Sequence, residues 1–287
     1  MILESLYNKD EFDIIEQSFK NKKNVCIFIN LLKTTSNLLE NAFLKLNLKF
    51  QKINDFCYVF KPNDKIILSK MDEFNKGYFY IQNFASYLCA KNLNVKSGES
   101  VLDLCAAPGG KSVNLANFMQ NQGYLACVEK NKERFFTLKE TIKKYNINAK
   151  CFLKNSINIG KLCPLKFDKI LVDAPCSTMA KTGFKNINKK EIKNLSLTQK
   201  KLLHSALNAL KIGGELVYST CTFLKEENEE VIENALNSEF KLLILDLDLE
   251  NIKAKNGISD IKELHKTKRI LPNEYCDGFF IARLKKI

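Results

Sequence analysis

The 287-residue sequence lacks the features that mark several common protein classes. It has only two histidines, and none of its ten cysteines forms a Cys-x-x-Cys pair, so no zinc or redox site is expected. No apolar run reaches the roughly eighteen residues that a membrane-spanning helix needs. Residues 1–5 do not form a charged leader before an apolar block, which predicts a cytoplasmic protein. Several cysteines lie in apolar runs and are expected to be buried, reduced thiols, namely Cys26, Cys57, Cys89, Cys127 and Cys151.

Glycine patterns are also sparse. The sequence has no Gly-x-Gly-x-x-Gly pattern, which argues against a dinucleotide site. Its one glycine-rich turn, around Gly109-Gly110, is not expected to be a phosphate-binding loop, which disfavours ATP. The two glycines nevertheless let the backbone approach a ligand at the start of a helix. Tight strand-to-helix packing is the alternative interpretation of this turn.

Charge is the strongest feature of the composition. The formal net charge is +13, from 45 basic and 32 acidic residues. This excess favours a polyanionic partner such as RNA over a neutral metabolite. An AT-rich genome, which favours lysine codons, would produce part of the same excess, so charge supports an RNA partner without deciding it.

Residues 1–75 predict a small α/β module. We expect it to serve as an RNA-binding accessory or a packing element. Its expected elements are an amphipathic helix over 11–20, a strand over 25–29, a helix over 35–46, and strands over 56–60 and 65–68.

Residues 76–287 predict a larger α/β unit, because strands alternate with helices as in a parallel sheet covered on both faces. Segments 240–245 and 278–284 are expected to pair as an antiparallel edge, and 185–201 is expected to be a basic loop. The expected helices are 78–93, 112–119, 132–145, 198–210 and 228–236, and the expected strands are 101–104, 124–128, 150–153, 168–172 and 215–219.

Ligands bind beyond the carboxyl ends of the strands in such a sheet, and the chemically notable residues follow those strands. Glu129 ends a strand 26 positions after Asp103, where a carboxylate can bind an unphosphorylated ribose, which favours S-adenosylmethionine. Cys176 stands in Asp-Ala-Pro-Cys and Cys221 in Ser-Thr-Cys-Thr. Their placement predicts one shared pocket, with one thiol to attack a substrate and another to assist its release. Core packing is the alternative role for both thiols.

Five ordered motifs make the chain resemble the RsmB/NOP/Sun family of RNA cytosine-5 methyltransferases. They lie at 77–86, 103–111, 173–177, 218–229, and 269–272 together with 277–280. The resemblance implies a Rossmann-like class I methyltransferase domain over 76–287, with S-adenosylmethionine as cofactor and RNA as substrate. Ribosomal RNA is the first expectation. Transfer RNA stays open, because the long helical amino-terminal domain of some bacterial members has no counterpart here.

The resemblance also implies roles for individual residues. Cytosine is too electron-poor at carbon 5 to accept a methyl cation, so a thiolate must first add at carbon 6. Cys221 matches the nucleophile of the family, and Cys176 the residue that assists release. Asp173 and Lys111 match residues that contact the base or the cofactor. The implied cofactor pocket comprises Cys105, Ala106, Ala107, Pro108, Gly109, Gly110, Lys111, Glu129, Arg134, Ser156 and Asp173.

Departures from the family pattern keep alternatives open. Asn155-Ser156 stands where relatives carry an Asp for the adenine, and residues 184–188 replace an expected Arg-Arg-x-Pro-Asp stretch. An RNA-binding assembly factor without turnover is therefore the alternative from another class, and a DNA cytosine methyltransferase would leave the Thr-Cys motif unexplained. The acidic run at 226–230 is expected to be the solvated first turn of a helix.

Overall fold

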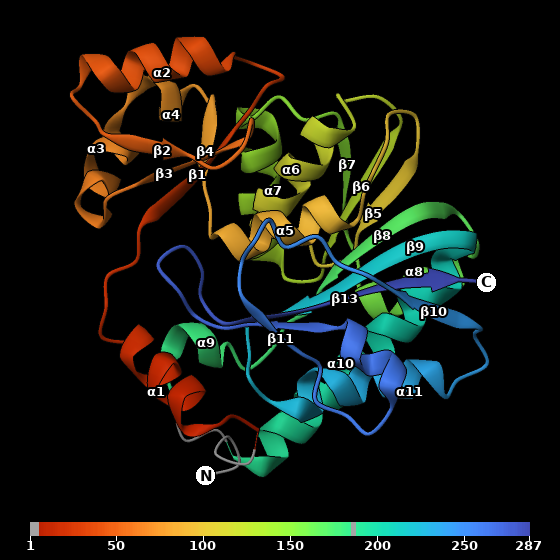
Figure 1. The fold of residues 1–287 in the computed structure, drawn as a ribbon. Helices are drawn as coiled ribbons and strands as arrows, with labels where there is room; N and C mark the ends of the chain where they lie inside the picture. The colour runs from red at the N-terminus through yellow and green to blue at the C-terminus, as the bar shows by residue number, and fades with distance from the viewer. Residues whose placement is uncertain (1–5, 185–187) are drawn as a thin grey trace.

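The computed structural model describes residues 6–184 and 188–287, which form a larger and a smaller β-sheet with helices packed on them (Figure 1). The larger sheet has nine strands in the order β11-β12-β13-β9-β8-β5-β6-β7, with β10 also paired to β13. Its strands are β5 (Ser100–Asp103), β6 (Tyr124–Glu129), β7 (Ala149–Leu153), β8 (Phe167–Asp173), β9 (Leu210–Thr220), β10 (Leu242–Leu245), β11 (Ala254–Asn256), β12 (Lys268–Ile270) and β13 (Phe279–Lys286).

The centre of this sheet is parallel and its C-terminal side is antiparallel. Parallel pairs join β5 to β6 and β8, β6 to β7, and β8 to β9. Strand β13 runs antiparallel to β9, β10 and β12. The predicted α/β class with an antiparallel C-terminal edge is confirmed, as is the pairing of 240–245 with 278–284. The chain leaves β5 toward β6 and returns to its other side as β8, which makes the β5–β8 boundary a topological switch point.

Helices cover both faces of the larger sheet. One face packs on α5 (Phe84–Asn92), α6 (Gly110–Phe118) and α7 (Lys132–Lys144), and the other packs on α8 (Ile159–Leu162), α10 (Lys189–Ala209) and α11 (Glu229–Leu236). Apolar strand residues such as Leu102 and Leu171 are fully buried between these layers. The packing on both faces explains the nearly continuous apolar runs of the central strands.

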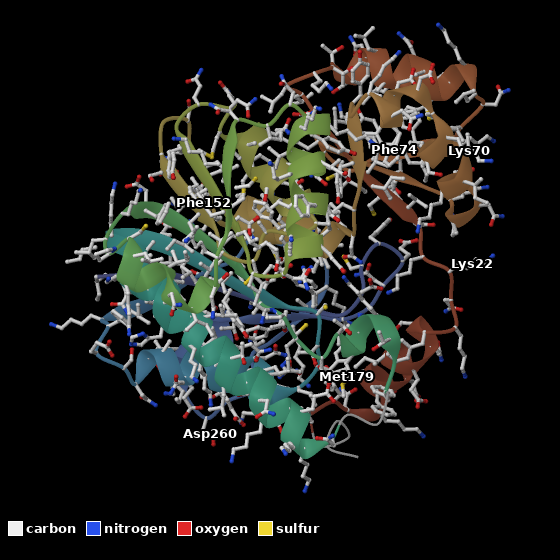
Figure 2. The ribbon with its side chains drawn as sticks, turned by 180° about the vertical axis from the view of Figure 1, so that it is seen from behind. Lys22, Lys70, Phe74, Phe152, Met179 and Asp260 are labelled. Carbon is white, nitrogen blue, oxygen red and sulfur yellow. The ribbon has the colours of Figure 1, made fainter. Side chains whose placement is uncertain are left out.

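The smaller sheet is antiparallel, in the order β2-β3-β1-β4. Figure 2 shows this unit from behind, with Lys70 and Phe74 on its helices and Phe152 on β7 of the larger sheet. Its elements are β1 (Val25–Ile29), α2 (Ser36–Lys45), β2 (Phe50–Lys52), β3 (Cys57–Phe60), α3 (Lys65–Lys70), α4 (Asp72–Asn75) and β4 (Phe79–Ile81).

Three expected elements are wrong. Residues 65–68 form helix α3 instead of a strand, because Pro62–Asp64 forms a helical turn that leads directly into it, and Ile66 stays 65% exposed. The expected helix over 78–93 is interrupted, since β4 pairs with β1 and α5 starts only after Asn83, whose side chain caps it. In the expected basic loop, 185–187 lie outside the described residues, and α10 already begins at Lys189 with Asn188 as its cap.

The expected burial of cysteines is largely confirmed. Cys26, Cys57, Cys89 and Cys127 are buried and Cys151 is half-buried, all as free thiols. Within the two described ranges, no helix combines the length and apolar character needed to span a membrane.

A short helix, α1 (Lys9–Ser18), packs near α9 (Met179–Thr182) through a buried apolar cluster (Figure 1). Arg269 lies beneath this region and is fully buried. It donates to both carboxylate oxygens of Glu229, to the Tyr7 hydroxyl at 2.6 Å and to the Phe223 carbonyl at 2.8 Å. One guanidinium therefore ties together β12, α11 and the segment before α1.

Replacing Arg269 by methionine should lower the free energy of unfolding by about 3–5 kcal/mol, because Glu229 would stay buried without its charge partner. Urea denaturation measures this change. The matched control is Lys266→Met, which removes an exposed charge from the same segment. A loss below about 1 kcal/mol in Arg269→Met would contradict a stabilising role for the pair, since that is the usual value of an exposed ion pair.

Candidate active site

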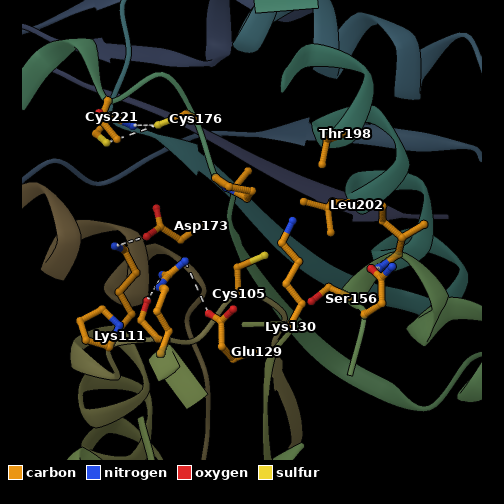
Figure 3. Close-up of a pocket in the computed structure, with 18 of the residues that line it drawn as sticks. Cys105, Lys111, Glu129, Lys130, Ser156, Asp173, Cys176, Thr198, Leu202 and Cys221 are labelled. Carbon is orange, nitrogen blue, oxygen red and sulfur yellow. Dashed lines mark hydrogen bonds and ion pairs between the residues drawn. The ribbon is translucent and has the colours of Figure 1, made fainter. Parts of the chain in front are cut away.

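Four parallel strands end at the same edge of the larger sheet. Their last residues are Asp103 in β5, Glu129 in β6, Asp173 in β8 and Thr220 in β9. The loops that follow them converge on a cavity of about 390 Å³. Figure 3 shows Cys176 and Cys221 at one end of this cavity and Glu129 at the other, with Asp173 between them.

The two cysteines of interest are direct neighbours. Their sulfur atoms are 3.3 Å apart, and the Cys221 N–H donates to the Cys176 sulfur at 3.4 Å. Both thiols are partly exposed and line the cavity. The structure thus brings together two residues that are 45 positions apart in the chain.

The pair is electrically asymmetric. The hydrogen bond from Cys176 lowers the pKa of Cys221, and the charges of Lys181 and Lys111 act in the same direction against burial. The same hydrogen bond, together with burial, raises the pKa of Cys176. A thiolate is the reactive form of cysteine, so Cys221 is the better nucleophile of the two at neutral pH.

Lys111 and Asp173 form an ion pair beside the cysteines. The Lys111 ammonium donates to Asp173 Oδ2 at 2.7 Å and to Ser86 Oγ at 3.2 Å, and Ser219 Oγ donates to Asp173 Oδ1 at 2.9 Å. Burial alone would lower the pKa of Lys111, but the Asp173 carboxylate holds this pKa above its ordinary value. The ammonium therefore stays charged, and both carboxylate oxygens are fixed.

The glycine turn approaches its surroundings too closely for side chains. Gly109 has φ of 116°, and a Cβ on Gly110 would lie 2.8 Å from a ring carbon of Tyr80. Although Gly110-Lys111-Ser112 matches the end of a phosphate-binding loop, Cys105 replaces the first glycine of that pattern, and Lys111 turns to Asp173. The turn therefore ends like a phosphate-binding loop but lacks the first glycine of that loop, and its lysine is already paired with a carboxylate.

The expected cofactor residues are only partly brought together. Cys105, Ala107, Pro108, Lys111, Glu129, Arg134, Ser156 and Asp173 line the cavity. Ala106, Gly109 and Gly110 are buried and lie outside its lining, where they shape the turn from behind.

The far end of the cavity is built around Glu129, which is 3% exposed. One of its oxygens accepts from the Asn131 N–H at 2.8 Å, and the other lies 3.7 Å from the Arg134 guanidinium. Arg134 also donates to the Ala107 carbonyl at 2.6 Å, which joins the β6 end to the glycine turn. Arg134 therefore supports both walls of the cavity.

Ser156 is buried, and its hydroxyl donates to the Leu104 carbonyl at 2.6 Å. The Asn155 side chain accepts from the Ile157 N–H at 3.2 Å and lies at the surface. The serine thus fixes the loop after β7 onto the end of β5, while its hydroxyl oxygen keeps acceptor capacity toward the cavity.

Several cavity residues were not anticipated from the sequence, including Lys130, Thr178, Lys181, Thr198, Leu202 and Phe279. Most lie in loops or on α10, where no local pattern marks them. Phe279 begins β13 and lies 5.6 Å from the Lys111 ammonium, measured to the ring centroid.

The expectation of a solvated acidic run is wrong for Glu227 and Glu229, which are fully buried. Each accepts hydrogen bonds from other parts of the fold, which compensates for burial.

A sheet with a parallel centre, a glycine turn after β5 and an acid at the end of β6 is typical of a cofactor-binding α/β domain. Comparison with known families is more specific. The model of the 16S rRNA methyltransferase RsmB/F family matches residues 90–285, so the chain belongs to this family.

Known proteins show the same relationship. The chain is 33% identical to the tRNA (cytosine(72)-C(5))-methyltransferase of Pyrococcus horikoshii, over 77% of this chain and 55% of that protein. It is 36% identical to the ribosomal RNA small subunit methyltransferase F of Vibrio cholerae, over 77% and 48%. The chain therefore spans about half the length of these curated relatives. The crystal structure of a methyltransferase homologue from Pyrococcus horikoshii superposes with a TM-score of 0.83 and 31% identity, covering 96% of this chain and 90% of that one.

The asymmetry of the thiol pair predicts the pH dependence of alkylation. Cys221 should react with iodoacetamide along a curve centred below the ordinary thiol pKa, and Cys176 only at higher pH. Replacing Cys176 by alanine removes the hydrogen bond that favours the Cys221 thiolate, so the Cys221 curve should move to higher pH. Peptide mass spectrometry after timed alkylation measures both curves. An unchanged Cys221 curve in Cys176→Ala would contradict this coupling.

Proposed function

We propose that this protein transfers a methyl group from S-adenosylmethionine to carbon 5 of a cytosine in RNA. The observation that carries the proposal is the 3.3 Å contact between Cys176 and Cys221 at one end of a cavity whose other end holds Glu129. Membership of the RsmB/F family and relatives named as cytosine-5 methyltransferases support the same chemistry.

The cavity residues fit such a cofactor. The Glu129 oxygen facing Arg134 has capacity to accept from a ribose hydroxyl, and the buried Ser156 can accept at the loop after β7. Cys105, Ala107 and Pro108 supply a close backbone wall. When bound, S-adenosylmethionine supplies an electrophilic methyl group on a sulfonium.

The two thiols divide the remaining chemistry. The Cys221 thiolate adds to carbon 6 of the cytosine, which makes carbon 5 nucleophilic. After carbon 5 is methylated, Cys176 assists removal of its proton, and the electrons of that C–H bond restore the ring double bond as the Cys221 sulfur leaves. The lowered pKa of Cys221 supports its assignment as the nucleophile.

Lys111 and Asp173 are proposed to orient the base. Their ion pair lies between the cysteines and the glycine turn, and each partner is held by a serine. A carboxylate fixed in this way can accept from the cytosine amino group, while the ammonium can donate to a ring acceptor or the carbonyl. Because both groups are already paired and positioned, little reorganisation is needed when the base enters.

RNA is the proposed partner, in agreement with the net charge of +13. The family description favours ribosomal RNA, and the archaeal relative favours transfer RNA. Incubating the purified protein with labelled S-adenosylmethionine and RNA from cells lacking the gene distinguishes the two substrates. Bisulfite mapping of the product then identifies each methylated cytosine. An assembly factor without turnover would bind RNA and produce no labelled cytosine.

Substituting the cysteines one at a time should separate their roles. Cys221→Ala should reduce methyl transfer about a thousandfold or more and form no covalent RNA complex, because the nucleophile is lost. Cys176→Ala should also transfer poorly but accumulate a covalent complex that denaturing gels resolve. Cys163→Ala is the matched control, since it removes a thiol outside the cavity. Accumulation in Cys221→Ala instead would reverse the assignment.

Glu129→Ala should weaken S-adenosylmethionine binding by roughly tenfold or more, the usual cost of losing a hydrogen bond to a charged group. Isothermal calorimetry measures the affinity directly. Glu133→Ala serves as the control, because it removes an exposed acid from the adjoining helix. Equal affinities in Glu129→Ala and the unsubstituted protein would contradict the proposed ribose contact.

A further inference from the structure

The acidic run after Cys221 includes two buried side chains that reach both cysteine loops. Glu227 and Asn228 lie at the end of a helical turn (Lys225–Glu227) and are both 0% exposed. Tyr218 of β9 donates from its hydroxyl to the Glu227 carbonyl at 2.7 Å, which anchors this turn to the sheet. The position of these polar groups inside the protein calls for a specific explanation.

Glu227 holds the loop that carries Cys176. Its Oε2 atom accepts from the Ser177 N–H at 3.0 Å and from the Gln199 amide at 2.8 Å. The same Gln199 amide donates to the Pro175 carbonyl at 3.0 Å. The residues immediately before and after Cys176 are therefore both fixed by one carboxylate–amide pair.

Asn228 holds the loop that carries Cys221 in a similar way. Its Oδ1 atom accepts from the Thr220 hydroxyl at 2.5 Å, and its amide donates to the Thr222 carbonyl at 3.1 Å. These residues immediately precede and follow Cys221. A further contact of 2.7 Å between the Ser177 and Thr222 hydroxyls links the two loops directly.

We propose that Glu227 and Asn228 are positioning residues that set the distance between the Cys176 and Cys221 sulfur atoms. Neither side chain lines the cavity, so each acts through the backbone that it holds. Since the two residues are consecutive in one anchored turn, neither loop can shift without straining its hydrogen bonds to that same buried turn. The proposal deepens the proposed function, because two thiols that act on one base must keep a fixed separation.

A thiol–disulfide equilibrium reports this separation without RNA or cofactor. The Cys221 thiolate displaces one glutathione from oxidised glutathione, and Cys176 then displaces the second, which leaves a Cys176–Cys221 disulfide and two reduced glutathiones. Peptide mass spectrometry at graded ratios of reduced to oxidised glutathione gives the effective concentration of one thiol relative to the other.

Glu227→Ala and Asn228→Ala should each lower this effective concentration by about tenfold or more, because the released loop explores other positions. Glu227→Gln keeps an acceptor for the Ser177 N–H, so its effective concentration should stay close to that of the unsubstituted protein. Glu230→Ala, in the same acidic run but not fully buried, should leave it unchanged. Wild-type values in both alanine variants would overturn the proposal.

Folding and function are separated by two further measurements. Circular dichroism and thermal unfolding identify variants that do not fold. If the alanine variants of Glu227 or Asn228 do not fold, Ser177→Ala is the milder variant, because it removes only the hydroxyl contact between the loops and should lower the effective concentration severalfold. With RNA as substrate, the folded alanine variants should lose kcat while KM for RNA stays within about twofold. If the glutathione equilibrium responds but the unsubstituted protein methylates no RNA, the proposed function fails and the positioning role stands.

Discussion

The parallel pairing of β8 with β9 is the constraint on which the site depends. This register places Asp173 opposite Ser219, so the two strands end level with each other. Cys176 follows Asp173 by three residues and Cys221 follows Ser219 by two, and the loops therefore reach the same point. Ser219 also donates to Asp173 across the pair, which links strand register to the orientation of a cavity carboxylate. A shift of one residue would turn Ser219 to the other face of the sheet and separate these groups.

Charge compensation is the second theme of the structure. Lys111 is neutralised by Asp173, Glu129 lies beside Arg134, and the fully buried Glu229 is paired with Arg269. These pairs allow ionised groups to be buried, because an isolated charge would be costly in the protein interior. Lys130 and Lys181 are exposed at the cavity, where they can attract a phosphate backbone. The cavity thus combines a fixed, neutralised interior with a positive rim.

Local patterns predicted much of this arrangement. The alternation of apolar strands with helices was sufficient to predict that β5 to β9 follow one another along the chain with helices between them. The position of Glu129 at the end of β6 followed from the same pattern. Residues 65–68 were assigned wrongly because Ile66 and Ile67 favour strands, although a preceding helical turn decides the outcome. The burial of Glu227 and Asn228 was not predictable, since their partners Gln199, Ser177 and Thr220 come from separate segments.

In the proposed reaction, Cys221 attacks a cytosine while Cys176 faces the same base. RNA that carries 5-fluorocytosine traps this step, because fluorine at carbon 5 cannot be removed as a proton and the covalent complex persists. After incubation with S-adenosylmethionine, nuclease and protease digestion followed by mass spectrometry identifies the modified cysteine. A methylated fluoropyrimidine is expected on Cys221 alone. A nucleotide attached to Cys176, or no covalent complex with any RNA that the protein methylates, would contradict it.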